Sequence, residues 1–370
     1  MSERRQYRIY YGDLDRLLLE CVQPLLERAT PVLSHRFWER HYAGGTHLRV
    51  TLRGDHDRVH EVGALLNDAA RSFMASHPSP DATTYSAERV ADLLRQEGDD
   101  LELEDLRYRN NTVELWPHPA QRARYLTPDA VILAEDFRHD TMTLAGRILA
   151  SATPRRDAML QLYFLNAILV GHDSLPEGAV SYKSHWEGFA ATFVSVELLD
   201  RIRGSYTSHR ESILGLLREV VERWDQHTIA DDPNLAAWQS LFQRYAARIR
   251  ATLAEGRHVT RQPATPEGAR QLREELYTIV RRDSEFVRAL WSDERFMASL
   301  QFNRGFIVAR VLTNLLYTLL AAVGLHAIDR MSLCYYAHRA AEDHYGCNLT
   351  DILQGNIEAI VRSHADRWAS

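Results

Sequence analysis

Ser181-Tyr182-Lys183-Ser184-His185-Trp186-Glu187-Gly188-Phe189 is the stretch around which the rest of the sequence can be organised. It follows a segment rich in turn residues, 171–178, and it opens an apolar run. The apolar side chains of that run recur every three or four residues, which places them on one face of a helix: Trp186, Phe189, Phe193 and Val196. We expect Ser184 to be the N-cap of this helix, with Glu187 in the capping-box position.

His185 would then lie in the first turn of that helix. The positive end of the helix dipole and the free backbone N–H groups lower the pKa of an imidazole there and attract anionic oxygen. A neutral histidine beside the hydroxyls of Tyr182 and Ser184 can act as a general acid or base near pH 7. The alternative is a capped helix in which His185 makes only a local hydrogen bond, and the local sequence leaves both interpretations open.

The composition is that of a globular protein, with 45% hydrophobic and 25% charged residues. A length of 370 residues allows two domains, or one large domain with a small appendage. The net charge of −6 gives no general case for nucleic-acid binding. The three cysteines (Cys21, Cys334 and Cys347) are too few and too dispersed for a disulfide framework or a zinc site, so we expect no metal. The N-terminus shows no apolar signal segment, and we expect a cytoplasmic protein.

The most hydrophobic run of the chain, 305–325, contains Arg310 near its middle, which favours a buried helix over a membrane span. On this predicted helix, 303–323, four polar side chains are separated by seven, four and three residues and form one stripe: Asn303, Arg310, Asn314 and Tyr317. Buried polar groups need hydrogen-bond partners. The stripe therefore either forms an internal hydrogen-bond network or lines a cavity.

The N-terminal part alternates predicted strands and helices in the order β-α-β-β-α. The strands are 7–11, 32–42 and 47–53, and the helices are 13–28 and 55–73. One further strand, predicted at 111–116, would complete a split-βαβ (ferredoxin-like) sheet. We assign residues 1–127 to this α+β region, with a mobile acidic insertion near 77–107.

From residue 128 onward the pattern is almost entirely helical. The predicted helices are 128–150, 155–171, 184–203, 207–225, 234–254, 266–281, 284–297, 303–323, 327–345 and 349–367. The fold class is therefore α+β, with a small N-terminal sheet and a large helical region, 128–370, which we expect to be catalytic.

The segment Gly44-Gly45-Thr46-His47-Leu48-Arg49 resembles the Gly-Gly-Pro-His-Leu-Arg segment of the C-terminal, elimination-type domain of lantibiotic dehydratases. The resemblance covers most of the chain. Three motifs of the eliminating members are altered here, at Thr51, at Arg124-Tyr125-Leu126-Thr127 and at Ser332-Leu333-Cys334-Tyr335. The stretch Ser181–Phe189 instead resembles stand-alone relatives that build the central pyridine ring of thiopeptides and pyritides.

This resemblance implies a cytoplasmic enzyme that needs no metal or redox cofactor. Its substrate would be a leader-bearing precursor peptide with dehydroalanines and azoles, and its reaction a formal aza-[4+2] cycloaddition that closes a macrocycle. His185, Tyr182, Ser184 and Tyr317 would move protons. Asn303, Arg310, Asn314 and Glu187 would bind the substrate. No nucleic acid or membrane partner is implied, and the oligomeric state stays open.

Leader binding is predicted for the N-terminal sheet, because leaders of this class are generally acidic. The cationic candidates are Arg36, Arg40, Arg49 and Arg53. Two alternatives remain. A stand-alone glutamate-eliminating lyase would use cationic groups for the leaving carboxylate. A non-catalytic scaffold would only hold a leader, by strand addition to an edge of the sheet.

Overall fold

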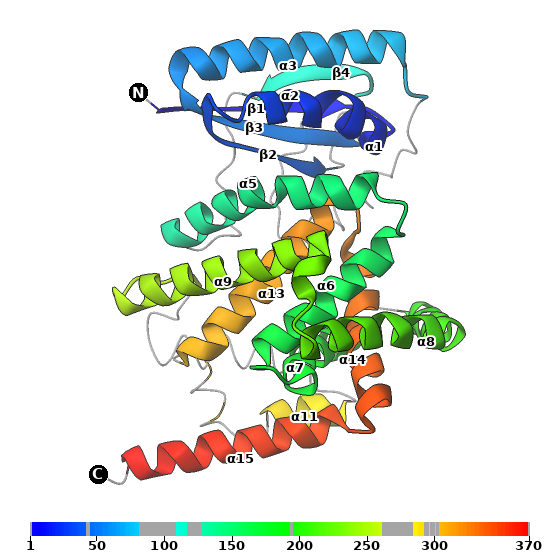
Figure 1. Cartoon of the computed structure of the whole chain (residues 1–370), viewed down its shortest axis with the longest axis vertical. Helices are drawn as coiled ribbons and strands as arrows, with labels where there is room; N and C mark the ends of the chain where they lie inside the picture. Colours follow the sequence, from blue (N-terminus) through cyan, green and yellow to red (C-terminus); the bar gives the residue numbers. More distant parts are fainter. Residues whose placement is uncertain are drawn as a thin grey trace. The chain divides into compact units, whose positions relative to one another are not determined.

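The computed structural model describes residues 2–41, 45–80, 109–116, 127–192, 195–260, 284–291, 296, 300 and 303–368. The chain divides into two compact units, Met1–Ala152 with Thr318–Gly324, and Thr153–Tyr317 with Leu325–Ser370. Figure 1 labels their elements. Most of the predicted acidic insertion and the predicted helix 266–281 lie outside the described residues.

The first unit contains a four-stranded sheet in the order β2-β3-β1-β4, in which all neighbouring strands are antiparallel. The strands are β1 (Ser2–Tyr10), β2 (Leu33–His41), β3 (His47–Asp55) and β4 (Thr112–Trp116). The α+β prediction is confirmed, and so is the predicted strand 111–116, which pairs with β1.

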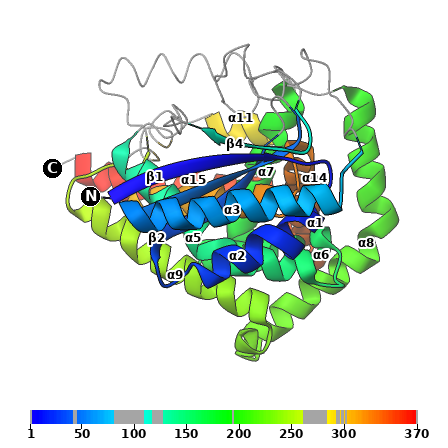
Figure 2. The same cartoon turned by 90° about the horizontal axis from the view of Figure 1, so that it is seen from above.

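Three consecutive helical segments connect β1 to β2: α1 (Leu14–Leu17), the π-helix η1 (Leu18–Val22) and α2 (Gln23–Arg28). The helix α3 (His56–Ser76) follows β3 directly, because Asp55 caps it by accepting a hydrogen bond from the Asp57 N–H. In Figure 2, α3 lies along the strands of the sheet, and it packs against β1, β3 and β4.

Strand register divides the side chains of this sheet between two faces, because successive residues of a strand point to opposite sides. Tyr7 pairs with Val50 on the face that α3 covers, where the Tyr7 hydroxyl lies close against Gly63. The opposite face carries Phe37 and Glu39 of β2 and is covered there by α5 (Pro128–Ala150). Helix α5 thus belongs to the sheet's compact unit. The division near residue 152 differs from the boundary predicted at residue 127 for this reason.

The second unit is built from helices. They are α6 (Arg155–Val170), α7 (Leu175–Thr192), α8 (Val196–Asp225), the short 3-10 helix η3 (Ile229–Asp231), α9 (Pro233–Ala254), α11 (Glu285–Trp291), most of α13 (Arg304–Ala322), α14 (Ala327–Tyr345) and α15 (Leu349–Trp368). Helix α7 contacts α6, α11, α14 and α15, so that it runs through the middle of this unit.

Helix α7 begins at Leu175, nine residues before the predicted start at Ser184. Pro176 is tolerated because it lies in the first turn, where a missing N–H breaks no helical hydrogen bond. Gly178 is a packing residue, since a Cβ there would lie 1.9 Å from the carbonyl oxygen of Ala167 on α6. The turn lies just before α7, where His172 and Asp173 have positive φ angles. The predicted N-cap at Ser184 is therefore wrong.

Helix α8 also departs from the prediction, because it runs without a break through Gly204. Its N-cap is Ser195, whose Oγ accepts a hydrogen bond from the Leu198 N–H at 3.3 Å. A Cβ at Gly204 would meet open space, so this glycine neither ends the helix nor permits close packing. The predicted pair of helices 184–203 and 207–225 is thus replaced by α7 and one long α8.

Among the described residues, one helix, α13, is long and apolar enough to cross a membrane. Of the most apolar window of this helix, 56% is buried inside the fold. Its residues contribute to both compact units. Of the predicted polar stripe, Tyr317 is buried, whereas Arg310 and Asn314 are exposed. The expectation of a buried helix is therefore wrong for this face.

Candidate functional site

His185 of α7 and Tyr317 of α13 lie together in the second unit, although 132 residues separate them in sequence. The Tyr317 hydroxyl is hydrogen-bonded to His185 Nδ1, and its oxygen lies 3.3 Å from the Sγ of Cys334 on α14. The Arg330 guanidinium lies over the Tyr317 ring, 5.2 Å from its centroid. We call His185, Tyr317, Cys334 and Arg330 the imidazole cluster.

The imidazole cluster holds its histidine in the neutral form. Burial, together with the positive charges of Arg330 and Arg310, lowers the pKa of His185 to about 4. Burial and the neighbouring Cys334 thiol raise the pKa of Tyr317 well above its usual value. The cause differs from the predicted one, since His185 lies in the middle of α7 and not at the helix start. At neutral pH the pair is uncharged.

The other ring nitrogen of His185, Nε2, has no hydrogen bond to any of the described residues, and the side chain is half-buried. In the tautomer that carries its proton on Nε2, Tyr317 donates to Nδ1 and Nε2–H is available to a substrate oxygen. In the other tautomer Nε2 accepts a proton. A neutral imidazole can therefore exchange protons with a substrate amide in either direction without first becoming charged.

Tyr182 and Ser184 do not join the imidazole cluster in the way the sequence suggested. The Tyr182 ring is 1% exposed and stacks on Tyr163 of α6. Its hydroxyl donates to the Tyr163 carbonyl oxygen at 3.0 Å and accepts from Asn166 at 2.9 Å. Tyr182 thus joins α6 to α7, and its buried hydroxyl is not accessible to a substrate. Ser184 is half-buried in the middle of α7.

The remaining members of the stripe on α13 have different environments. Asn303 precedes the helix, and its Oδ1 accepts from the Phe306 N–H at 3.0 Å, which is the hydrogen bond of an N-cap. Arg310 and Asn314 follow on the exposed side of the helix. Arg310 lies near enough to His185 to lower its pKa. The stripe therefore leads from the surface at Arg310 and Asn314 to the buried Tyr317.

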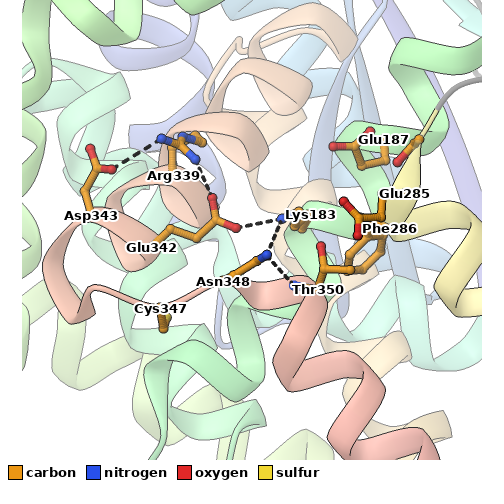
Figure 3. Close-up of a pocket in the computed structure, with 11 residues that line it drawn as sticks. Lys183, Glu187, Glu285, Phe286, Arg339, Glu342, Asp343, Cys347, Asn348 and Thr350 are labelled. Carbon is orange, nitrogen blue, oxygen red and sulfur yellow. Dashed lines mark hydrogen bonds and ion pairs between the residues drawn. The ribbon is translucent and has the colours of Figure 1, made fainter.

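A pocket of about 570 Å³ opens on the other side of α7 and contains neither His185 nor Tyr317. Lys183 and Glu187 of α7 line it, together with residues of α11, α14 and the start of α15 (Figure 3). Lys183 Nζ lies 2.6 Å from Glu342 Oε1, and Arg339 Nη1 lies 2.6 Å from Glu342 Oε2. Figure 3 shows the Glu342 carboxylate between these two cations.

The ion pairs of this pocket extend beyond Glu342. Asp343 accepts hydrogen bonds from the Arg210 Nε at 2.7 Å and from the Tyr206 hydroxyl at 2.8 Å. Burial raises the pKa of the Glu342 carboxyl, but the hydrogen bond and charge of Lys183 outweigh it, so that the pKa lies below its usual value. Glu342 is therefore ionised, and it cancels much of the positive charge around it.

Sequence reasoning found Glu187 but missed Lys183, Arg339 and Glu342 as members of one pocket. A signal was present within α14, because Arg339 and Glu342 are three residues apart and so share a helix face. Arg330 was missed as well, although it lies one turn before Cys334 on the same face of α14. What the sequence could not show is the packing of α14 against α7.

The four arginines predicted to bind a leader do not form one exposed surface. Arg36 and Arg40 lie on one face of the sheet, and Arg49 and Arg53 on the other, because Arg36 pairs with Leu52 in the strand register. Arg36 is buried and donates to the Leu26 carbonyl oxygen at 2.6 Å. Arg40 donates to Asp15 and to the Ala322 carbonyl oxygen, and Arg49 is 6% exposed. Arg53 is half-buried.

A family model described as lantibiotic biosynthesis dehydratase C-term matches residues 5–341, and the chain belongs to that family. No curated protein sequence matches the chain.

Two solved structures have the same fold over nearly their whole length. One is "Pyridine synthase, TbtD, from thiomuracin biosynthesis", with a TM-score of 0.71, 21% sequence identity, and coverage of 93% of this chain and 99% of that chain. The other is TsrL, with a TM-score of 0.69, 19% identity, and coverage of 96% and 98%. At these identities the likeness shows a shared fold.

Proposed function

We propose that this protein is a macrocyclising pyridine synthase of thiopeptide or pyritide biosynthesis. It would act on a ribosomally made precursor that still carries its leader peptide. The observation that carries the proposal is the hydrogen-bonded pair of His185 and Tyr317, with Arg310 and Asn314 on the adjoining surface. Family membership and a fold shared with a structure named as a pyridine synthase support it.

The proposed reaction joins two dehydroalanines by a formal aza-[4+2] cycloaddition. The amide of one tautomerises to an imidic acid when the nitrogen loses a proton and the carbonyl oxygen gains one. The resulting azadiene forms two carbon–carbon bonds to the alkene of the other dehydroalanine. Loss of water and of the leader peptide as its carboxamide then makes the ring aromatic.

The tautomerisation creates no net charge, and a neutral proton relay matches this requirement. His185 Nε2 would take the proton from the amide nitrogen and return it to the carbonyl oxygen, while Nδ1–H stays hydrogen-bonded to the Tyr317 oxygen. The imidazolium and the imidate exist only between these two transfers, so that the imidazole and the amide are both neutral before and after the step. Arg310 and Asn314 would hydrogen-bond the rearranging amide, and Asn303 would act mainly by starting α13 correctly. Tyr182 stays outside the relay, since its hydroxyl is buried and hydrogen-bonded to α6 inside the fold.

The pocket beside Lys183 would receive another part of the peptide, with Glu187 as a substrate-binding residue. A flexible substrate that must bring two alkenes together needs contacts at more than one point. We propose that the leader docks on the first unit, in a cytoplasmic protein. The strand order leaves β2 and β4 as the edge strands to which an extended peptide could add.

The test is incubation of the whole protein with a leader-bearing peptide that contains two dehydroalanines, read by mass spectrometry. The proposal predicts a cyclic product that has lost water and leader, and a separate leader carboxamide. With a glutamylated peptide as substrate, loss of glutamate would instead support a stand-alone lyase. If the peptide binds but its mass never changes, the scaffold alternative is supported and the proposal is wrong.

A further inference from the structure

Two histidines and a glutamate meet where β1 and α3 begin, in the first unit. Glu3 of β1 pairs with Gly54 at the end of β3, and Asp55 caps α3 immediately afterwards. His56 is thus the first residue of α3, and His60 lies one turn further on the same side of the helix. No local sequence pattern indicates this group, because Glu3 is 53 residues from His56 and only strand pairing brings it close.

The three side chains are close enough to share one metal ion. One ligand atom from each lies within 4.8 Å of the other two. The two imidazole rings are 4.4 Å apart between centroids. His56 Nδ1 contacts Glu3 Oε2, and His60 Nε2 lies 3.4 Å from Glu3 Oε1. Neighbouring ligands around a tetrahedral zinc ion are about 3.3 Å apart, given bonds of about 2.0–2.1 Å.

A cation already lies against this group of ligands. Arg5 Nε donates to Glu3 Oε1 at 2.7 Å, and Arg5 Nη2 contacts His60 Nε2. The hydrogen bond from Arg5, with the charges of Arg5, His56 and His60, keeps the pKa of Glu3 below its usual value. The Arg5 side chain is 22% exposed, so it can turn outward into solvent when another cation arrives.

We propose that Glu3, His56 and His60 form a binding site for a divalent transition-metal ion, and that this ion is Zn²⁺. Imidazole and carboxylate are donors that zinc binds well, and three protein ligands leave a fourth position for water. The bound ion ties the first strand of the sheet to the first turn of α3. Arg5 competes with it for Glu3 and His60. The site lies in the first unit, apart from the residues proposed for catalysis.

The test is zinc binding to the whole, metal-stripped protein by isothermal titration calorimetry, with the melting temperature as a second readout. We expect one zinc ion per chain and a higher melting temperature with zinc. His60→Ala should weaken binding by more than about tenfold, since losing even an outer partner of a metal ligand costs about 10–100-fold. His209→Ala is the matched control, because His209 is exposed on α8, and it should bind zinc as the wild type does.

A second variant keeps the test independent of folding. Arg5→Gln removes the competing cation and should tighten zinc binding, a gain that a misfolded protein would not show. Equal affinity in the wild type and His60→Ala would overturn the site. Unchanged or weaker zinc affinity in Arg5→Gln would overturn the proposal that Arg5 competes with zinc for Glu3 and His60. Binding that strengthens as the pH falls would also contradict the proposal, because a histidine must be deprotonated to bind a metal.

Discussion

Helix α7 carries two polar sites on opposite sides, and they satisfy their buried groups in opposite ways. On one side His185 meets Tyr317 and Cys334, three groups that are all neutral at pH 7. On the other side Lys183 meets Glu342 as an ion pair beside an open pocket. Between the two sites, the buried rings of Tyr182 and Trp186 pack against α6 and α14.

The difference follows from the free-energy cost of burying each kind of polar group. A neutral hydrogen bond costs little to bury, whereas an isolated charge must be paired. The neutral side can therefore take up a proton and return it, ending uncharged as it began, which suits a proton relay. The charged side is fixed by mutual attraction, which suits holding a substrate in place. Each of the following variants tests one side against the other.

The largest effect on stability is expected from the charged side. Glu342→Ala leaves Lys183 buried without its carboxylate, and the Lys183 side chain is only 12% exposed. Breaking a buried pair costs roughly 3–5 kcal/mol, which chemical denaturation would measure. The double variant Lys183→Met/Glu342→Leu should recover most of this loss. A cost for Glu342→Ala as small as that of Glu187→Ala would show that the pair is not buried in solution.

A smaller loss is expected from the neutral side. Tyr317→Phe removes the hydrogen bond to His185 and should cost about 1–3 kcal/mol, because His185 Nδ1 loses its partner. The sequence left open whether Tyr317 pairs inside the fold or lines a cavity, and in the structure its hydroxyl pairs with His185. Turnover should also fall at a temperature where the variant stays folded. Tyr335→Phe, half-buried on α14, is the control; a normal rate with normal stability in Tyr317→Phe would contradict the network.

Two histidines that the fold keeps neutral, His185 and His338, should make stability depend on pH. The pKa is about 4 for His185 and about 3 for His338, both lowered first of all by burial. An unfolded histidine takes up its proton near pH 6.5. Stability is therefore full above about pH 6.5 and falls as the pH drops toward 4, by at most about 1.4 kcal/mol per pH unit for each histidine.

Denaturation curves at several pH values would measure this slope. Replacing both histidines in His185→Gln/His338→Gln should make the slope shallower between pH 6.5 and 4. An unchanged slope in that variant would mean that neither histidine is held neutral by the fold.

The smallest effect on stability is expected from replacing single serines, and it tests where α7 begins. Ser195→Ala removes the N-cap of α8 and should cost about 1 kcal/mol. Ser184→Ala removes a serine from the middle of α7, where we expect a change within about 0.5 kcal/mol. Thermal unfolding of both variants gives the comparison, and a larger loss in Ser184→Ala than in Ser195→Ala would reverse it.

The sequence predicted the elements of this fold well wherever apolar spacing and capping residues agreed. Helices α5 and α14 and the strand β4 lie within one residue of their predicted bounds. The prediction failed around residues 171–204, because Pro176, Gly178 and Gly204 look alike as helix breakers. Only packing distinguishes them, since Gly178 lies against the α6 backbone and Gly204 faces open space.

For the candidate site, the sequence identified His185 and Tyr317 separately, one by its motif and the other by a polar stripe. Their contact depends on the packing of α7 and α13, which no local pattern encodes. The neutral state of His185 was predicted from a helix dipole that does not act on it, and burial with Arg330 and Arg310 supplies the cause instead. The four arginines predicted to bind a leader do not share one exposed face, because residue spacing along a strand does not show what covers each face. Their role in leader binding stays a prediction.

The most direct measurement is the single-turnover rate of pyridine formation on a leader-bearing dehydroalanine peptide, for the wild type, His185→Ala and the control His209→Ala. If His185 relays protons, His185→Ala should react roughly 10²–10⁴ times more slowly, with leader affinity unchanged. His209→Ala should react like the wild type. A His185→Ala variant that folds, binds the leader and forms the ring at the wild-type rate would contradict the proton relay and leave His185 with a structural role.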